Sequence, residues 1–129
     1  MGQRARYRRR PDRPVVAVQL LLETPGFDYR KWGAEQHCKA GDWLVDNDGD
    51  VYTVDAESFA QTYSAVGTGT YVKTAPVWAE RADAAGSVTT KEGRTHYESG
   101  DWLVSNAEDG SDSYAISAAK FETLYEPEA

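Results

Sequence analysis

The sequence predicts an α+β fold of mostly antiparallel strands with two short helices, arranged as an internal duplication. Three observations predict it. The pentapeptide Gly-Asp-Trp-Leu-Val at residues 41–45 returns at residues 100–104. Each copy leads through turn-forming residues into a second β-prone segment, as in a hairpin. Each hairpin is followed by apolar residues at helical spacing. We expect the two copies to pack with approximate twofold symmetry.

The repeat divides the chain into four segments that share one compact domain. The 129 residues, with a mass of 14.3 kDa, are enough to bury an independent core. Residues 23–35 predict no particular element. The expected segments are a basic N-terminal arm at residues 1–13, repeat 1 at 14–66, a linker at 67–70 and repeat 2 at 71–129.

Segments upstream of each pentapeptide predict further strands. Residues 15–22 are apolar and form one strand candidate. Residues 71–81 are β-prone, but Pro76 interrupts them because proline cannot donate to a β-ladder. Residues 88–90 and 94–97 flank a glycine-containing turn and predict a hairpin. Together with the two main hairpins, we expect seven or eight strands.

A short helix is predicted directly after each main hairpin. Asp55 and Ser117 stand at N-cap positions, where a side-chain oxygen accepts hydrogen bonds from the free amides of the first turn. Phe59 and Phe121 are then placed to pack against the residue before each cap. Helices this short must pack on their own hairpins to be stable. The aromatic residues that we expect in the core are Trp43, Trp102, Phe59, Phe121, Tyr63 and Tyr125.

Charge is distributed unevenly along the chain. The sequence has 14 basic and 21 acidic residues, for a formal net charge of −7, yet residues 1–13 are strongly basic. Arginine side chains bind phosphate groups. The acidic remainder of the chain repels a polyanion at short range, so we do not expect a nucleic-acid partner. The arm is either a lead-in to the first strand, kept for solubility or docked on the acidic body, or a segment that binds phosphate weakly. The arginines assigned to polyanion contact are Arg4, Arg6, Arg8, Arg9 and Arg10.

The composition favours a cytoplasmic protein that does not enter a membrane. No stretch is long and apolar enough for a membrane-spanning helix. Residues 15–22 contain Gln19 and no cleavage site follows them, which argues against a signal peptide. Cys38 is the single cysteine, so it forms no internal disulfide and no zinc cluster. We expect neither a metal nor a cofactor.

Half of the chain resembles a known family. The residues that carry the resemblance are 40–45 (Ala-Gly-Asp-Trp-Leu-Val), Tyr52, Phe59 and Tyr63, with 7–10 and 14–19 at the start. They are similar to the PGDYG-type module of phage and bacterial proteins of unknown function, in which a Gly-Asp-aromatic hairpin precedes a short helix. The sequence departs from that module in having Ala40 and Ser99 where the family has proline, and tryptophan in place of tyrosine. The resemblance implies a phage-related protein, and it carries over no catalytic residues.

His37 and His96 are the sharpest candidates for chemistry. They lie at the same distance before the two pentapeptides, so twofold packing would bring two imidazoles to one ligand or proton-transfer site. A metal site needs at least three ligands and only these two can be named, which favours hydrogen-bonded strand histidines. Cys38 neighbours His37 in a strand, so the two side chains point to opposite faces, and we expect a buried, inert thiol.

Aromatic residues without a partner in the other repeat suggest a binding surface. Tyrosine and tryptophan are enriched in pockets and interfaces. With the two histidines, the residues assigned to ligand binding are Trp32, Trp78 and Tyr97. An oligomer interface is the alternative for these aromatic side chains.

The sequence favours a non-catalytic binding or assembly module whose ligand or protein partner is unidentified. It offers no complete catalytic constellation. A homodimer or other homo-oligomer also fits, because exposed sheet edges must be covered. The alternative is a small enzyme, or a metal- or ligand-handling protein, in which His37 and His96 share a cleft between the copies with Asp42 or Asp101.

Overall fold

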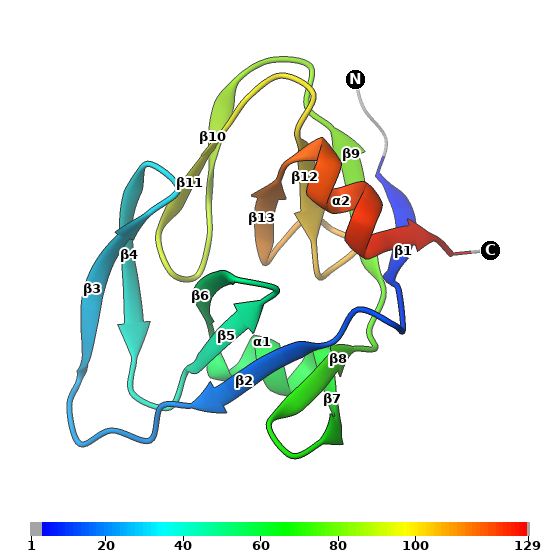
Figure 1. The fold of residues 1–129 in the computed structure, drawn as a ribbon. Helices are drawn as coiled ribbons and strands as arrows, with labels where there is room; N and C mark the ends of the chain where they lie inside the picture. The colour runs from blue at the N-terminus through cyan, green and yellow to red at the C-terminus, as the bar shows by residue number, and fades with distance from the viewer. Residues whose placement is uncertain (1–3, 129) are drawn as a thin grey trace.

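The computed structural model describes residues 4–128, which form fourteen strands and two helices (Figure 1). The protein is mostly antiparallel β, and the strands outnumber the seven or eight that were predicted. Two five-stranded sheets and two separate hairpins account for all of the strands in this part of the chain.

The first sheet, called sheet B here, has the strand order β6-β5-β2-β8-β7. Its strands are β2 (Val15–Gln19), β5 (Trp43–Asn47), β6 (Asp50–Val54), β7 (Tyr63–Gly67) and β8 (Thr70–Lys73). The predicted first hairpin is present as β5–β6, in which Trp43 lies opposite Val54. The buried residues of its core cluster are Val15, Ala17, Val45 and Phe59.

The second sheet, sheet A, has the strand order β13-β12-β9-β1-β14. Its strands are β1 (Ala5–Arg9), β9 (Val77–Arg81), β12 (Trp102–Ser105), β13 (Ser113–Ile116) and β14 (Tyr125–Pro127). The predicted second hairpin is present as β12–β13, in which Trp102 lies opposite Ile116. The buried residues of its core cluster are Val77, Ala79, Val104, Phe121, Leu124 and Tyr125.

Each sheet contains one strand from the other half of the chain. Strand β1 pairs with β9 and β14 in sheet A, whereas the next strand, β2, lies in sheet B. Strand β8 pairs with β2 and β7 in sheet B, whereas β9 lies in sheet A. The chain therefore passes between the sheets at residues 10–14 and again at 74–76, where Pro76 separates β8 from β9 (Figure 1). The two halves of the chain cannot separate unless the pairing of β1 in sheet A and that of β8 in sheet B are both broken.

Two segments that were expected to lie outside the sheets are part of them. The predicted basic arm contains β1, although residues 1–3 of that arm lie outside the described residues. Strand β1 was missed because its outward positions are arginines, while Tyr7 and Arg9 face inward. The predicted linker at residues 67–70 is the tight turn of the β7–β8 hairpin.

The two remaining hairpins lie side by side (Figure 1). They are β3 (Gly26–Lys31) with β4 (Ala34–Lys39), and β10 (Gly86–Thr89) with β11 (Arg94–Tyr97). The second was predicted and the first was not. The fully buried Gln36 joins them, because its side-chain amide donates to the Arg94 carbonyl at 2.7 Å.

The repeated Gly-Asp pair has a structural role in both copies. Gly41 and Gly100 each have φ +93°, a backbone conformation that favours glycine. The carboxylate of Asp42 accepts from the Lys39 amide at 2.9 Å, and the carboxylate of Asp101 accepts from the Glu98 amide at the same distance. Each pair therefore closes the turn that leads into its tryptophan strand.

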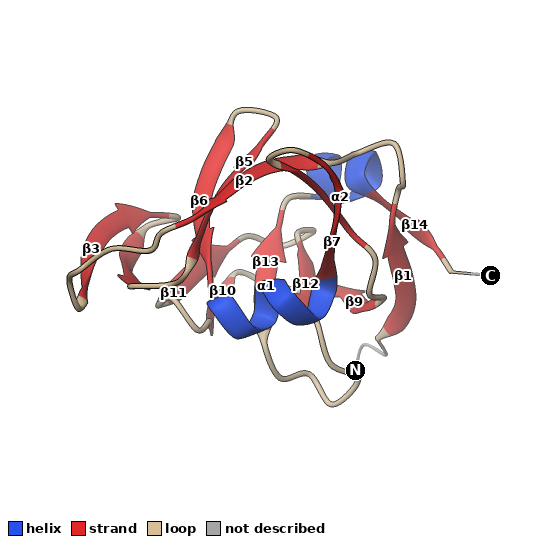
Figure 2. Cartoon of the chain, turned by 90° about the horizontal axis from the view of Figure 1, so that it is seen from below, coloured by secondary structure: helices blue, strands red, loops and turns tan. Residues whose placement is uncertain are grey.

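The helices α1 (Ala56–Thr62) and α2 (Ala118–Leu124) begin at the predicted caps (Figure 2). Asp55 accepts from the amides of Glu57 and Ser58, and Ser117 accepts from that of Lys120. Tyr63 and Tyr125, which were expected in the core, are the extended C-cap residues of these helices and begin β7 and β14. Both pack against the core clusters.

Candidate functional site

A cavity of about 320 Å³ is lined by residues of both sheets. Its walls come from β6, α1 and β8 on one side and from β13, α2 and β1 on the other. The volume lies at the small end of the range of ligand pockets, roughly 300–1,000 Å³. The lining includes the exposed residues His96 and Lys120, so the cavity reaches the protein surface there.

Residues at corresponding positions of the two halves meet in this cavity. Tyrosines that follow the two main turns face tyrosines that follow the two helices, and each exchanged strand adds one cationic side chain at its end. The residues at corresponding positions are Tyr52 and Tyr114, Tyr63 and Tyr125, and Arg9 and Lys73.

Lys73 is buried among tyrosines, with 6% of its surface exposed. Its Nζ donates to the Tyr114 hydroxyl at 3.1 Å and lies 5.0 Å from the centre of that ring and 5.8 Å from that of Tyr63. The Tyr114 and Tyr125 hydroxyls are 2.8 Å apart and share a hydrogen bond. Burial lowers the pKa of Lys73, because the charged ammonium loses its hydration.

Arg9 is equally buried, with 4% of its surface exposed. Its Nη2 donates to Asn47 Oδ1 at 2.8 Å, and its Nε donates to the Arg13 carbonyl at 2.9 Å. Its guanidinium carbon lies 5.8 Å from the centre of the Tyr125 ring. Within residues 4–128, neither Arg9 nor Lys73 forms an ion pair with a carboxylate, although buried charges are usually paired.

The two cations make the four tyrosines unequal. Burial raises the pKa of Tyr52, Tyr63 and Tyr114 above its ordinary value. Burial acts in the same direction on Tyr125, but the charges of Lys73 and Arg9 outweigh it and lower its pKa. The cavity therefore favours negative charge at the point where Tyr125 meets the cations.

Trp32 stands at the edge of the cavity on the β3–β4 turn. Its φ of 55° is uncommon for a bulky side chain. Gly33 follows it with φ 77°, which gives the pair the two positive φ angles of a tight hairpin turn. The Trp32 ring lies 5.6 Å from that of Tyr52. The turn therefore holds the ring of Trp32, a residue that is 37% exposed, beside Tyr52 in the cavity wall.

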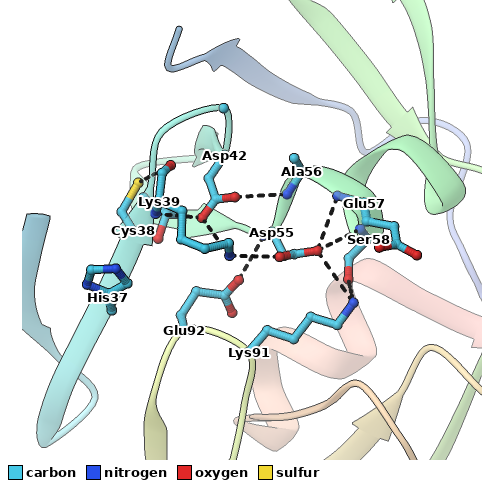
Figure 3. A network of polar contacts seen from close by, with 12 residues as sticks. His37, Cys38, Lys39, Asp42, Asp55, Ala56, Glu57, Ser58, Lys91 and Glu92 are labelled. Carbon is cyan, nitrogen blue, oxygen red and sulfur yellow. Dashed lines mark hydrogen bonds and ion pairs between the residues drawn. The ribbon is translucent and has the colours of Figure 1, made fainter. Parts of the chain in front are cut away.

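A polar network connects the cavity wall to the first repeat (Figure 3). Glu92, on the β10–β11 turn, lines the cavity and accepts from the Asp55 amide at 2.8 Å. Burial raises the pKa of Glu92 to about 7. The Asp55 carboxylate lies 2.9 Å from Lys39 Nζ and 3.4 Å from Lys91 Nζ, and these contacts with its helix-cap bonds lower its pKa to about 2. The network fixes the turn that carries Glu92 onto α1.

The structure separates the residues that were assigned to ligand binding. Trp32 and His96 line the cavity, whereas His37, Trp78 and Tyr97 are absent from its lining. His37 lies opposite Asp28, with Nδ1 2.6 Å from the carboxylate. That pairing was missed because β3 was not predicted. In the described part of the chain, no three His, Cys, Asp or Glu residues gather to hold a metal ion.

Most arginines of the predicted arm contact carboxylates of the protein itself. Arg6 pairs with Glu128 at 2.7 Å, and Arg8 pairs with Glu126 at 2.6 Å. The further pairs are Arg4 with Glu80 and Arg10 with Glu126. These contacts agree with the alternative in which the arm docks on the acidic part of the chain.

Most of the residues that line the cavity were not predicted from the sequence. Arg9 was named only as a polyanion contact, and Lys73, Tyr52 and Tyr114 were not named as site residues. The sequence did contain one signal. A tyrosine and, two residues later, a cationic residue precede each segment that passes between the sheets: Tyr7 and Arg9 before residues 10–14, and Tyr71 and Lys73 before residues 74–76. It was obscured because the crossing segments differ in length.

Within residues 4–128, no helix combines the length and the apolar character needed to cross a membrane. Comparisons with protein-family models, curated proteins and solved structures found no match. The resemblance to the PGDYG-type module therefore stays a prediction.

Proposed function

We propose that the protein is a non-catalytic binding module and that its ligand is a small molecule held in the cavity between the two sheets. The observation that carries this proposal is the cavity itself. Polar and aromatic side chains from both halves converge on a space of about 320 Å³ that reaches the surface. Apolar walls with a few converging polar groups are typical of small-molecule sites.

We also propose that the chain is a duplicated module with approximate twofold symmetry. Three features support this. The strand orders of the two sheets correspond position by position, the exchanged strands occupy the same place in each order, and both Gly-Asp turns have the same φ and hydrogen bond. A site on or near the symmetry axis then receives one copy of each side chain from each half.

The alternative of a small enzyme has less support. It requires His37 and His96 in one cleft, but only His96 lines the cavity, and His37 is paired with Asp28. It also uses Asp42 or Asp101, whose carboxylates accept backbone hydrogen bonds in the turns before β5 and β12.

We extend the proposal to location and assembly. A cytoplasmic location agrees with a single free thiol, Cys38, which is buried. A homodimer formed through the edge strands β6, β7 or β14 is compatible with the sheet topology, whereas the fourth edge strand, β13, already contacts β10 and β11.

A fragment screen followed by nuclear magnetic resonance tests the cavity proposal. We expect hits that shift the resonances of Tyr52, Tyr114 and the Trp32 indole. Trp32→Ala removes an aromatic wall at the edge of the cavity and should weaken these hits about tenfold, a loss typical of aromatic residues that contact a ligand. Trp78→Ala, a matched change outside the cavity lining, should leave them unchanged. Hits that map only elsewhere, or equal effects of the two variants, would overturn the proposal.

A further inference from the structure

We infer that the ligand of the cavity is a small organic anion whose carboxylate or phosphate group binds between Lys73 and Arg9. This inference rests on the proposed function, because it assigns a chemical class to the ligand of the same site. It is carried by two buried cations that face one cavity and form no ion pair with a carboxylate among the described residues.

The two cations retain unused hydrogen-bond donors. A lysine ammonium has three donors, and Lys73 uses one toward the Tyr114 hydroxyl. An arginine guanidinium has five, of which Arg9 uses one toward Asn47 and one toward the Arg13 carbonyl, and the guanidinium also lies beside the Tyr125 ring. A carboxylate or phosphate accepts several such bonds at once, and guanidinium groups suit it particularly well.

The electrostatic balance of this end of the cavity also calls for an anion. Loss of hydration lowers the pKa of Lys73 and the positive charge of Arg9 adds to this effect, whereas Tyr125 and Asp112 act in the opposite direction without cancelling it. The charges of Lys73 and Arg9 lower the pKa of Tyr125. A bound anion would reverse both effects, because it stabilises the protonated lysine and competes with ionised Tyr125.

The carboxylates that line the cavity already have partners. Asp50 pairs with Lys31 and Lys120 at 2.9 and 2.8 Å. Asp112 accepts from the Ser58 hydroxyl at 2.7 Å and from the Asn106 side chain at 3.0 Å.

The two other acidic residues in the lining are bonded to the backbone. Glu92 accepts from the Asp55 amide, and Asp101 accepts from the Glu98 amide. All four acidic groups of the lining are therefore engaged, whereas Lys73 and Arg9 have no carboxylate partner among the described residues.

Asn106 adds a second recognition feature. Its Oδ1 is buried and has no hydrogen-bond partner among the described residues, because its amide nitrogen faces the Asp112 carboxylate. At the corresponding position of the other half, Asn47 Oδ1 accepts from Arg9. Lys73 stands where Arg9 stands but bonds to Tyr114 instead. A ligand that carries a donor as well as the anionic group would satisfy this oxygen.

A matched pair of ligands tests the inference. para-Hydroxybenzoate and para-hydroxybenzamide have nearly the same shape and differ in charge, and both carry a phenolic donor. We expect calorimetric titration at neutral pH to show that the benzoate binds at least about tenfold more tightly, with resonance shifts at the cavity. Inorganic phosphate, measured against sodium chloride at equal ionic strength, should compete with the benzoate.

Two charge-removing variants separate a specific site from general screening. Lys73→Met keeps the length of the side chain and should abolish the preference for the anion. Arg30→Met removes one exposed charge on β3, where Arg30 is 72% exposed, and should preserve that preference. The wild-type comparison stands by itself if Lys73→Met fails to fold. Equal or tighter binding of the benzamide in the cavity would overturn the anion inference and leave the proposed function standing. Two results would overturn both proposals. One is that the compounds shift only resonances outside the cavity. The other is that neither compound nor phosphate binds and the fragment screen also finds no hits in the cavity.

Discussion

The indole of Trp43 stacks on the ring of Phe59 with 4.1 Å between centroids and 12° between planes. Trp102 and Phe121 have the same separation and the same angle. A tyrosine from the exchanged strand completes each cluster edge-on: Tyr71 from β8 in sheet B, and Tyr7 from β1 in sheet A. The repeated aromatic residues therefore build two matching cores, and residues packed in or against each core line the cavity.

The matching cores predict matching energetics. Phe59 and Phe121 are each 2% exposed, so truncation of either to alanine leaves a cavity in a packed cluster. We expect Phe59→Ala and Phe121→Ala each to lower the free energy of unfolding by about 3–5 kcal/mol. Urea denaturation measures both. A loss confined to one of the two variants would contradict the equivalence of the two cores.

The Gly-Asp turns predict a backbone cost. A Cβ atom built on Gly41 meets nothing within 4 Å, so a substitution there is opposed by its φ of +93° alone. We expect Gly41→Ala and Gly100→Ala each to destabilise the protein by about 1–2 kcal/mol. Thermal unfolding checks this, with Gly67→Ala as the control, since Gly67 lacks a positive φ. Unchanged stability in either turn variant would refute the structural role of that glycine.

Glu92 predicts a pH dependence of stability. Its folded pKa of about 7 lies above the ordinary value of 4.5, so the folded state holds this proton more tightly than the unfolded state. The stability that the proton contributes is present below pH 4.5 and is lost as the pH rises through 7. Glu92→Gln mimics the protonated form and should raise the free energy of unfolding at pH 8 by up to about 3 kcal/mol, with little change at pH 4.5.

Denaturant unfolding at the two pH values measures the effect of Glu92→Gln. Glu35→Gln removes the same charge from an exposed side chain on β4, 58% of which is accessible, and serves as the control. If Glu92→Gln has the same effect at both pH values, Glu92 does not titrate in this range.

Lys73 predicts a gain in stability when its charge is removed. A buried cation without a carboxylate partner opposes folding because it has lost its hydration, and apolar replacement of buried ion pairs is often stabilising by about 1–4 kcal/mol. In the absence of ligand, Lys73→Met should therefore unfold at a higher temperature than the wild type. A large loss of stability would instead mean that the hydrogen bond to Tyr114 outweighs the burial of the charge.

The local elements could be predicted from the sequence because their signals are local. The main hairpins, the caps at Asp55 and Ser117 and the break at Pro76 all follow from neighbouring residues. The pairing of β1 with β9 and β14 could not be predicted, since strand pairing depends on residues far apart in the chain. An arginine-rich segment gives little β signal, and the carboxylates that neutralise it, such as Glu126, lie at the other end of the sequence.

The site was harder to predict for the same reason. Lys73 and Arg9 become neighbours of one cavity only because the first strands are exchanged between the sheets. The histidines were equivalent in sequence, but the unpredicted hairpin β3–β4 pairs His37 with Asp28. Trp32 was assigned to ligand binding because it has no aromatic counterpart in the other repeat, and its turn brings it to the edge of the cavity.

A crystal structure of the protein grown with para-hydroxybenzoate tests the central claim most directly. We predict electron density in the cavity between the sheets, with a carboxylate oxygen within hydrogen-bond distance of Lys73 Nζ and of the Arg9 guanidinium. Density for the compound at the protein surface alone, with Lys73 and Arg9 contacting no anion, would contradict the account.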